Sequence, residues 1–243
     1  MYIIKLDAID STNSYLKDMA SSNLPKDYTV VVADYQTDGR GQMGTQWQTE
    51  TGKNLTASVF KKLNDFNVQN QFYISMVISL TIYKALKSFK IPRLSIKWPN
   101  DILSADKKIC GILIENVIKN NQLQGSVIGF GLNVNQKYFN DLPQASSLSL
   151  LTGIVYNKDE ILSKILKELQ IYFRLLETQE FDVIKAEYEV LLFRKDKPST
   201  FRTSADEIFV GIIKGVSDIG KLKVCTEDDI IKIFDLKEVT LLY

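Results

Sequence analysis

The chain has 243 residues, 45% of them hydrophobic and 24% charged, and a formal net charge of +1, the composition of a globular protein with one large domain and room for a small second one. The balanced charge gives no support for a chain-wide nucleic-acid or membrane surface. Histidine is absent, which excludes Ser-His-Asp and Cys-His catalysis and removes the commonest zinc ligand.

The first half of the chain predicts strands, one long loop and one long helix. Residues 28–36 are rich in β-branched side chains and predict a buried strand, and residues 54–60 predict another. The stretch between them is too polar to be buried and too rich in glycine for a helix, so it predicts a long loop of the kind that is usually functional or disordered. A largely buried helix at 71–89 and a strand at 94–98 complete a crossover unit.

The middle of the chain predicts two long strands and an amphipathic helix. Residues 108–119 and 126–135 have the composition of strands, and Asn120-Asn121 between them suits a turn. Apolar residues recur at helical spacing over 159–176, and two acidic residues stand favourably at the start of this segment.

The pattern changes in the last fifty or so residues. A short helix is predicted around 181–192, and after the polar stretch that begins at Arg194 come short alternating apolar runs punctuated by glycines. These runs predict a small all-β domain of about five strands. We therefore expect two domains, residues 1–193 and residues 194–243.

Two further features bear on location. Cys110 and Cys225 lack the spacing of a metal site and suit a reducing cytosol. The charges at Lys5, Asp7 and Asp10 leave too short an apolar run for a signal peptide, and no stretch approaches the roughly 18 apolar residues of a membrane span. We expect a cytoplasmic protein.

Four short polar segments carry the chemistry. The first, STN at 11–13, could cap a helix, because its residues favour that position, or surround a polar ligand with donors and acceptors. The second, GRGQMG at 39–44, could turn backbone N–H groups toward an anion, although a flexible loop is the simpler interpretation. Trp47 in the same polar loop needs a surface to cover, for which a flat aromatic ligand is a candidate.

The third segment, KWPND at 97–101, suits an ordinary strand-ending turn, but its lysine could hold phosphate and its carboxylate magnesium. In the fourth, KICGIL at 108–113, a lysine at the start of an apolar strand could point into a cleft. Asn133 interrupts another apolar strand and needs a hydrogen-bonding partner. Neither Gly52-Lys53 nor the GFG at 129–131 completes a P-loop or a Rossmann motif.

Taken together and in this order, these segments resemble the catalytic domain of biotin protein ligases. The resemblance covers roughly residues 5–190, and KWPND followed by KICGIL is its most specific part. The matching motifs are STN at 11–13, GRGxxG at 39–44 followed by a tryptophan, KWPND at 97–101, KxxGIL at 108–113 and GxGxNVN at 129–135.

The resemblance implies an α+β fold: a mixed β-sheet flanked by helices, as in class II synthetases, followed by a small C-terminal SH3-like β-barrel. It also implies a reaction in two half-steps that uses ATP and Mg²⁺. Biotin first forms biotinyl-5'-AMP and pyrophosphate. A lysine of a biotin carboxyl carrier protein domain, from acetyl-CoA carboxylase or a related carboxylase, then takes the biotin and releases AMP.

The resemblance also implies roles for individual residues. Lys108 would bridge the biotin carboxylate and the α-phosphate and would be catalytic together with Arg40. Asp101 would hold the metal ion. The biotin site would comprise Ser11, Thr12, Asn13, Gln36, Gly39, Arg40, Gly41, Gln42, Lys108 and Gly111. The ATP site would comprise Trp47, Lys97, Asn100, Asp101 and Asn133.

The glycine-rich loop departs from the family pattern. Gln42 and Thr45 stand where many relatives carry arginine, so two cations are missing, and Lys53 could restore one. This departure concerns retention of the adenylate more than the chemistry, because Lys108 is present. Two alternatives stay open: a lipoate or octanoate transferase, for which the family expectation is another glycine motif and no KWPND, and a non-catalytic biotin sensor.

Some members of the family carry an N-terminal helix-turn-helix that represses transcription. Only ten residues precede Ser11 here. We therefore expect a monofunctional ligase that binds neither nucleic acid nor membranes.

Overall fold

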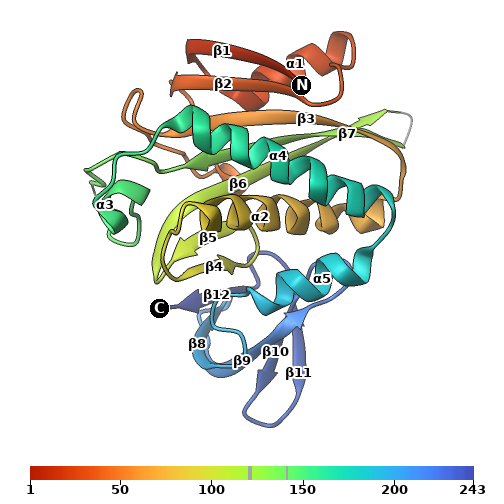
Figure 1. The fold of residues 1–243 in the computed structure, drawn as a ribbon. Coiled ribbons are helices and arrows are strands. Elements are labelled where there is room, and N and C mark those ends of the chain that lie inside the picture. The colour runs from red at the N-terminus through yellow and green to blue at the C-terminus, as the bar shows by residue number, and fades with distance from the viewer. Residues whose placement is uncertain (120–121, 141) are drawn as a thin grey trace.

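A seven-stranded mixed sheet forms the larger part of the molecule (Figure 1). The computed structural model describes residues 1–119, 122–140 and 142–243. The first two strands of the sheet run parallel and every other pair is antiparallel. The order is β1 (Tyr2–Ile9), β2 (Thr29–Gln36), β3 (Leu55–Phe66), β7 (Gln122–Leu132), β6 (Lys107–Lys119), β5 (Asp101–Ser104) and β4 (Leu94–Lys97).

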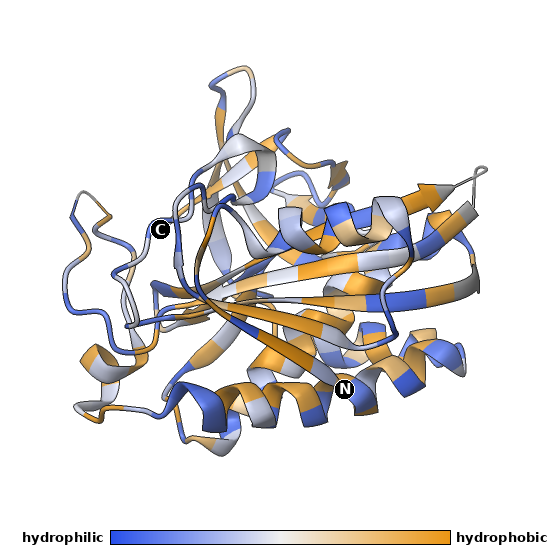
Figure 2. Cartoon of the chain, turned by 90° about the horizontal axis from the view of Figure 1, so that it is seen from above, coloured by the Kyte–Doolittle hydropathy of each residue, from blue (hydrophilic) through white to orange (hydrophobic). Residues whose placement is uncertain are grey.

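One face of this sheet is covered by helices α2 (Gln71–Ser88) and α4 (Lys158–Glu177), which lie across it in Figure 1. Because side chains alternate along a strand, residues such as Ala57, Ile112 and Ile128 point into this core. Helix α2 is buried along most of its length, which explains its apolar sequence, whereas α4 buries a single stripe. In Figure 2 hydrophobic segments gather in the sheet, and hydrophilic residues prevail in the loops at its rim.

The other face is covered only in part, by helix α1 (Thr12–Ser22). Leu16 of α1 packs in a small cluster with Val31, Phe60 and Val127. Farther along the same face, β3 and β7 carry small or polar residues instead of large apolar ones, among them Ser58 and the glycines of β7. This part of the face is therefore left open for a cavity.

A second, five-stranded antiparallel sheet follows helix α5 (Phe181–Val190). Phe209 stacks between Phe201 and Phe234 within it, and Trp98 Nε1 donates to Gly220 O over 2.8 Å, which ties the two sheets together. The predicted number of strands is confirmed. In the described part of the chain β11 and β12 are the edges of an open sheet, so the SH3-like closure stays a prediction. The order is β11 (Ile231–Phe234), β10 (Leu222–Thr226), β9 (Ile208–Val216), β8 (Pro198–Thr203) and β12 (Val239–Leu242).

The elements predicted from the sequence are largely confirmed, with shifts at their ends. The strand predicted at 54–60 continues to Phe66, and the one predicted at 126–135 spans Gln122–Leu132. The Asn120-Asn121 turn lies outside the described residues. The other predicted elements correspond to β2, β4, β6, α2, α4 and α5.

The predicted crossover unit exists, but its strands are not neighbours. From β3 to β4 the sheet passes through four antiparallel pairings in succession, so these two strands run parallel while β7, β6 and β5 lie between them. The sequence patterns did not predict strands β1 and β5, or the short helices η2 (Val68–Asn70) and α3 (Leu148–Thr152). None of the described helices has the length and apolarity needed to cross a lipid bilayer.

Candidate active site

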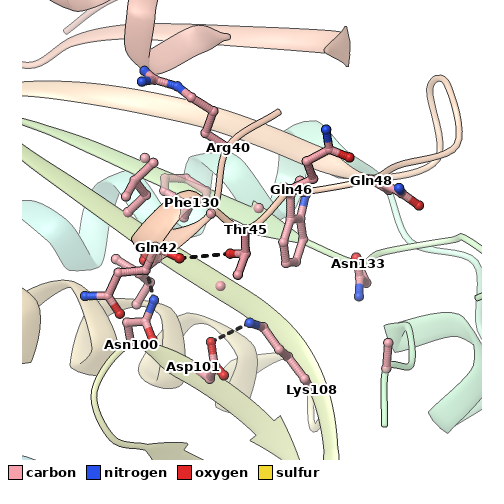
Figure 3. Close-up of a pocket in the computed structure, with 18 of the residues that line it drawn as sticks. Arg40, Gln42, Thr45, Gln46, Gln48, Asn100, Asp101, Lys108, Phe130 and Asn133 are labelled. Atoms are coloured by element: carbon pink, nitrogen blue, oxygen red, sulfur yellow. Dashed lines mark hydrogen bonds and ion pairs between the residues drawn. The ribbon is translucent and has the colours of Figure 1, made fainter. Parts of the chain in front are cut away.

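A cavity of about 850 Å³ lies on the open face of the large sheet. Its lining comes from the start of α1, strands β3, β6 and β7, the loop after β2, residues 139 and 142–145, and strand β12. Figure 3 shows a part of this lining, including Gln42, Asp101 and Lys108. The structure brings to this lining the predicted residues Ser11, Thr12, Asn13, Gln36, Arg40, Gly41, Gln42, Trp47, Lys97, Asn100, Asp101, Lys108, Gly111 and Asn133.

Gly39 is the one predicted site residue that does not line the cavity. Its carbonyl accepts the N–H of Trp47 over 2.8 Å, and a Cβ at Gly39 would lie 2.4 Å from the carbonyl oxygen of Trp47. Gly39 therefore shapes the loop and does not face a ligand directly.

The start of α1 serves both of the purposes suggested by its sequence. Ser11 caps the helix, and its hydroxyl accepts the N–H of Ser14 over 3.4 Å. Thr12 and Asn13 are buried at the cavity wall instead. The Thr12 hydroxyl donates to Gln36 Oε1 over 3.0 Å and lies 2.7 Å from the hydroxyl of Ser58.

Asn13 continues this hydrogen-bond chain. Its Nδ2 donates to the backbone oxygen of Leu113 over 3.3 Å and to Glu115 Oε2 over 2.9 Å. Its Oδ1 accepts from the Ser58 hydroxyl over 2.6 Å. This end of the cavity thus offers neutral amide and hydroxyl groups whose donor and acceptor sides are fixed by their neighbours.

Glycines on β6 and β7 form the floor of the cavity. Gly129 lies under Asn13, because a Cβ there would come within 2.3 Å of Asn13 Oδ1. Gly131 lies under Trp47, whose indole would be only 2.2 Å from an added Cβ, and Gly111 stands opposite Gly131 in the sheet register. The absence of side chains at these three positions is what lets Asn13 and Trp47 reach the sheet.

The glycine-rich loop folds back as a small hairpin. Arg40 and Gln46 form a β-bridge, Gly41 N donates to Thr45 O over 2.6 Å, and a 3-10 turn (Gln42–Gly44) forms the tip. The hairpin presents Gln42 and Thr45 to the cavity. Lys53, by contrast, is exposed and is not among the residues that line the cavity.

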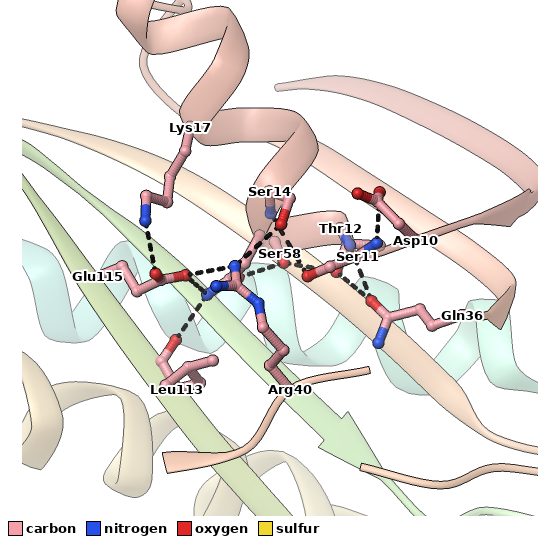
Figure 4. A network of polar contacts seen from close by, with 11 residues as sticks. Asp10, Ser11, Thr12, Ser14, Lys17, Gln36, Arg40, Ser58, Leu113 and Glu115 are labelled. Atoms are coloured by element: carbon pink, nitrogen blue, oxygen red, sulfur yellow. Dashed lines mark hydrogen bonds and ion pairs between the residues drawn. The ribbon is translucent and has the colours of Figure 1, made fainter. Parts of the chain in front are cut away.

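Arg40 points to α1 and not to the lysines at the other end of the cavity (Figures 3 and 4). Its Nη2 donates to the hydroxyl of Ser14 over 2.9 Å and lies 3.4 Å from Glu115 Oε2. The structure therefore places the two predicted catalytic residues, Arg40 and Lys108, on different sides of the cavity.

A charged cluster forms the other end. Lys108 Nζ lies 2.7 Å from Asp101 Oδ1, and Lys97 Nζ lies 3.9 Å from Asp101 Oδ2 and 5.1 Å from the centre of the Tyr243 ring. Burial lowers the pKa of the Lys97 ammonium below its ordinary value; Asp101 opposes this shift and Lys108 adds to it. Lys107 lies outside the cavity lining and donates to Pro143 O over 2.9 Å.

Two predicted asparagines use their amides on the backbone. Asn100 Nδ2 donates to Ile112 O over 2.8 Å and so fixes the turn before β5 against β6. Asn133 is buried, and its Nδ2 donates to Ser146 O over 3.1 Å. The hydrogen-bonding partner that we expected for Asn133 from the sequence is thus a backbone carbonyl.

Several lining residues were missed by the sequence analysis. Ser58 could have been found, because Thr56 and Ser58 alternate with apolar residues along β3, which marks one polar face. Lys237, Thr240 and Tyr243 had no local signal, since they reach the cavity only because the small sheet packs beside it.

The cavity offers little for a metal ion by itself. No cluster of three or more potential metal-ligating side chains occurs in the described ranges. Asp101 is the one carboxylate among the described lining residues. Magnesium is commonly held by one or two carboxylates plus substrate phosphates and water, so this donor set fits an ion that arrives with a nucleotide.

Comparison with known proteins decides the family. The model described as "Biotin/lipoate A/B protein ligase family" matches residues 6–133. The chain belongs to this family. The match contains the STN, GRGQMG, KWPND and KICGIL segments. It ends before residues 139 and 142–145 and before β12, so those parts of the wall lie outside it.

Individual members of the biotin/lipoate ligase family are similar over most of the chain. The bifunctional ligase/repressor BirA of Bacillus subtilis is 30% identical over 238 residues, which cover 96% of this chain and 72% of that protein. The biotin–[acetyl-CoA-carboxylase] ligase of Mycobacterium tuberculosis is 28% identical over 216 residues, or 87% of this chain and 79% of that one. The structure of the Aquifex aeolicus biotin protein ligase in complex with biotin and ATP matches 99% of this chain and 98% of that chain, with a TM-score of 0.82 and 27% identity.

Proposed function

We propose that the chain is a biotin protein ligase that activates biotin with ATP and transfers it to a lysine of a biotin carboxyl carrier protein domain, in acetyl-CoA carboxylase or a related carboxylase. One observation carries the proposal: a single cavity joins a neutral hydrogen-bonding end at Thr12, Asn13 and Gln36 to a cationic end at Lys108 and Lys97. Biotin has the same asymmetry, with a polar ureido ring at one end and a carboxylate at the other.

The proposed reaction has two steps, formation of the adenylate and transfer to the lysine. A carboxylate oxygen of biotin attacks the α-phosphorus of ATP, the bond from that phosphorus to the bridging oxygen breaks, and pyrophosphate leaves. The amine of the acceptor lysine then attacks the carbonyl carbon of the mixed anhydride. The carbon–oxygen bond to AMP breaks, AMP leaves, and the amine gives up a proton to water.

Lys108 is the proposed catalytic residue. Without substrate its ammonium pairs with Asp101, so the charge is already held at the end of the cavity. In the first step two anions, the biotin carboxylate and the α-phosphate, come together and negative charge develops on the α-phosphate oxygens, and a fixed ammonium offsets it without reorganisation. Asp101 would hold Mg²⁺, which neutralises charge on the triphosphate when bound. Arg40 would act from the opposite side of the cavity.

The remaining predicted residues would bind the two substrates, biotin and ATP. Ser11, Thr12, Asn13 and Gln36 would surround the ureido ring of biotin, over the floor that Gly111 and Gly129 leave open. The loop at Gly41 and Gln42 would cover the ligand, with Gly39 holding the shape of the hairpin. Trp47 and Asn133 would contact adenosine, and Lys97 and Asn100 would serve the phosphates.

We further propose that residues 1–193 form the catalytic domain and residues 194–243 a small SH3-like domain. The support is that β12 of the small sheet contributes Thr240 to the cavity, so the second domain would complete the site. The proposed activity needs neither nucleic acid nor a membrane and is expected in the cytoplasm.

Mass spectrometry tests the function directly. The protein, biotin, ATP and a carrier domain are incubated together, and a biotin-sized mass increase of the carrier is expected, with pyrophosphate and AMP as products. Lipoate in place of biotin should give no increase, and modification by lipoate alone would identify a lipoate ligase. Binding of biotin without pyrophosphate release would identify a sensor.

The titration of Lys97 predicts a pH dependence of ATP use. Because its pKa lies below that of an ordinary lysine, Lys97 is charged at lower pH and loses its proton as the pH rises through the lowered value. We expect the KM for ATP to rise by roughly tenfold across that range, because one charge-assisted contact worth about 1.5 kcal/mol is lost. In Lys97→Arg the guanidinium stays charged, so this rise should vanish. An unchanged pH profile in Lys97→Arg would remove Lys97 from the phosphate site.

Gln42 predicts how well the adenylate is retained. An arginine at this lining position would make a charge-assisted hydrogen bond worth about 1.5–3 kcal/mol, against about 1 for a neutral one. The difference of about 0.5–2 kcal/mol means that Gln42→Arg should release free biotinyl-adenylate roughly 2- to 30-fold more slowly, measured by mass spectrometry of the filtrate, and label fewer bystander lysines. Lys53→Ala is the matched control and should change nothing, since Lys53 is exposed and outside the lining. Increased release from Lys53→Ala would instead mean that Lys53 folds in.

A further inference from the structure

A carboxylate that does not line the cavity connects three elements behind its wall. Glu115 of β6 lies four residues beyond Gly111, on the same face of the strand, and its side chain is only 19% exposed. Its Oε2 accepts from Asn13 over 2.9 Å and lies 3.4 Å from Arg40 Nη2. Its Oε1 accepts from Lys17 over 2.7 Å. One side chain thus joins α1, β6 and the glycine-rich hairpin (Figure 4).

Glu115 fixes the direction of the hydrogen-bond chain. The carboxylate only accepts, and so does the Leu113 carbonyl, so both must face Nδ2 of Asn13. The Asn13 Oδ1 is then turned to Ser58 and accepts its hydroxyl proton. A glutamine at 115 could donate as well as accept, so this orientation would then rest on the longer contact with the Leu113 carbonyl, 3.3 Å from Nδ2.

Glu115 also anchors the hairpin. Arg40 Nη2 is held by the Ser14 hydroxyl at 2.9 Å and by the Glu115 carboxylate, and both anchors belong to the body of the protein. Arg40 Nε is buried and lacks a partner within the described ranges, so this donor is not used in the anchoring. Burial acts to raise the pKa of Glu115, but hydrogen bonds from Lys17 and Asn13 and the charge of Arg40 outweigh it and leave the pKa below its ordinary value.

We propose that Glu115 is a positioning residue that holds the Gly39–Trp47 hairpin over the cavity through Arg40 and orients Asn13 for ligand binding. The biotin part of this proposal rests on the proposed ligase function, whereas the hairpin part does not. Glu115 touches neither reacting atom, so its loss should affect binding and loop closure more than the rate of the chemical step.

Glu115→Gln tests this, because it keeps the size of the side chain and removes its charge. We expect limited chymotrypsin cleavage at Trp47, without ligand, to accelerate by roughly tenfold, and the KM for biotin in pyrophosphate exchange to rise by a similar factor, while kcat changes by less than about threefold. Lys17→Met is the matched control. It removes only the outer partner of the Glu115 carboxylate, a lysine whose side chain is 43% exposed. The cleavage rate, the KM for biotin and kcat should all stay near wild type.

Arg40→Ala separates anchoring from a general loosening of the fold. If Glu115 holds the hairpin through Arg40, then Glu115→Gln adds no further cleavage in an Arg40→Ala background. Ser14→Ala, which removes the other anchor, should accelerate cleavage in the same direction. Wild-type cleavage in both Glu115→Gln and Ser14→Ala, or a full additional effect of Glu115→Gln on top of Arg40→Ala, overturns the proposal. If the wild type forms no biotinyl-adenylate, the ligase function fails, and cleavage alone decides the role of Glu115.

Discussion

Lys108→Ala is expected to slow biotinyl-adenylate formation by about 10²- to 10³-fold, the usual cost of removing one fixed group that stabilises developing negative charge. The reason is local: Lys108 is held at the end of the cavity by Asp101, 2.7 Å away, before any substrate arrives. The alanine variant loses both the charge and its preorganisation. Pyrophosphate exchange dependent on biotin is the measurement, with thermal unfolding to show that the fold persists.

Lys107→Ala is the matched control for this prediction. Lys107 is the preceding residue, but it lies outside the cavity lining and donates to the carbonyl of Pro143. Its exchange rate should stay within about twofold of wild type, as is usual for a substitution away from the site. Equal rates for wild type, Lys107→Ala and Lys108→Ala would show that the role proposed for Lys108 is wrong.

Gly129→Ala and Gly131→Ala are expected to weaken different substrates, although the two positions are two residues apart on one strand. A Cβ at Gly129 would lie 2.3 Å from Asn13 Oδ1, and one at Gly131 would lie 2.2 Å from the Trp47 indole. Overpacking of this kind costs about 1–3 kcal/mol, which corresponds to roughly 5- to 150-fold in affinity. Gly129→Ala should raise the KM for biotin, and Gly131→Ala the KM for ATP.

Each of these glycine variants serves as the control for the other. Both add one methyl group to the same face of β7, so a general disturbance of the sheet would raise both constants in both proteins. Measuring the KM for biotin and for ATP in the two variants separates the cases. If the two patterns are the same, Asn13 and Trp47 do not divide the cavity into a biotin part and an adenosine part.

Local patterns predicted the large elements well. The apolar run at 71–89 and the helical spacing over 159–176 identified α2 and α4, because burial against one sheet imposes those patterns directly. The candidate site residues were proposed from the motif resemblance, and the structure brings all of these candidates but Gly39 to one lining. The STN segment shows why composition alone could not decide: all three residues line the cavity, and Ser11 caps the helix as well.

The features that the sequence analysis missed depend on contacts between distant segments. Strand β5 has only four residues, and its position is set by pairing on both sides with β4 and β6. Glu115 looks like an ordinary charged residue in a strand, and its role emerges only when α1 and the hairpin are packed around it. Tyr243 is likewise placed by the packing of the small sheet, so no local sequence pattern indicates that it lines the cavity.

The distribution of the cavity wall along the sequence has a consequence for biosynthesis. Ser11 is synthesised long before Tyr243, yet both line the same cavity. Such non-local contacts form late in folding, because loop closure must be completed before they contribute. A nascent chain that has folded its first strands therefore lacks part of the wall. We therefore expect the proposed activation of biotin only from molecules in which β12 has docked beside the large sheet.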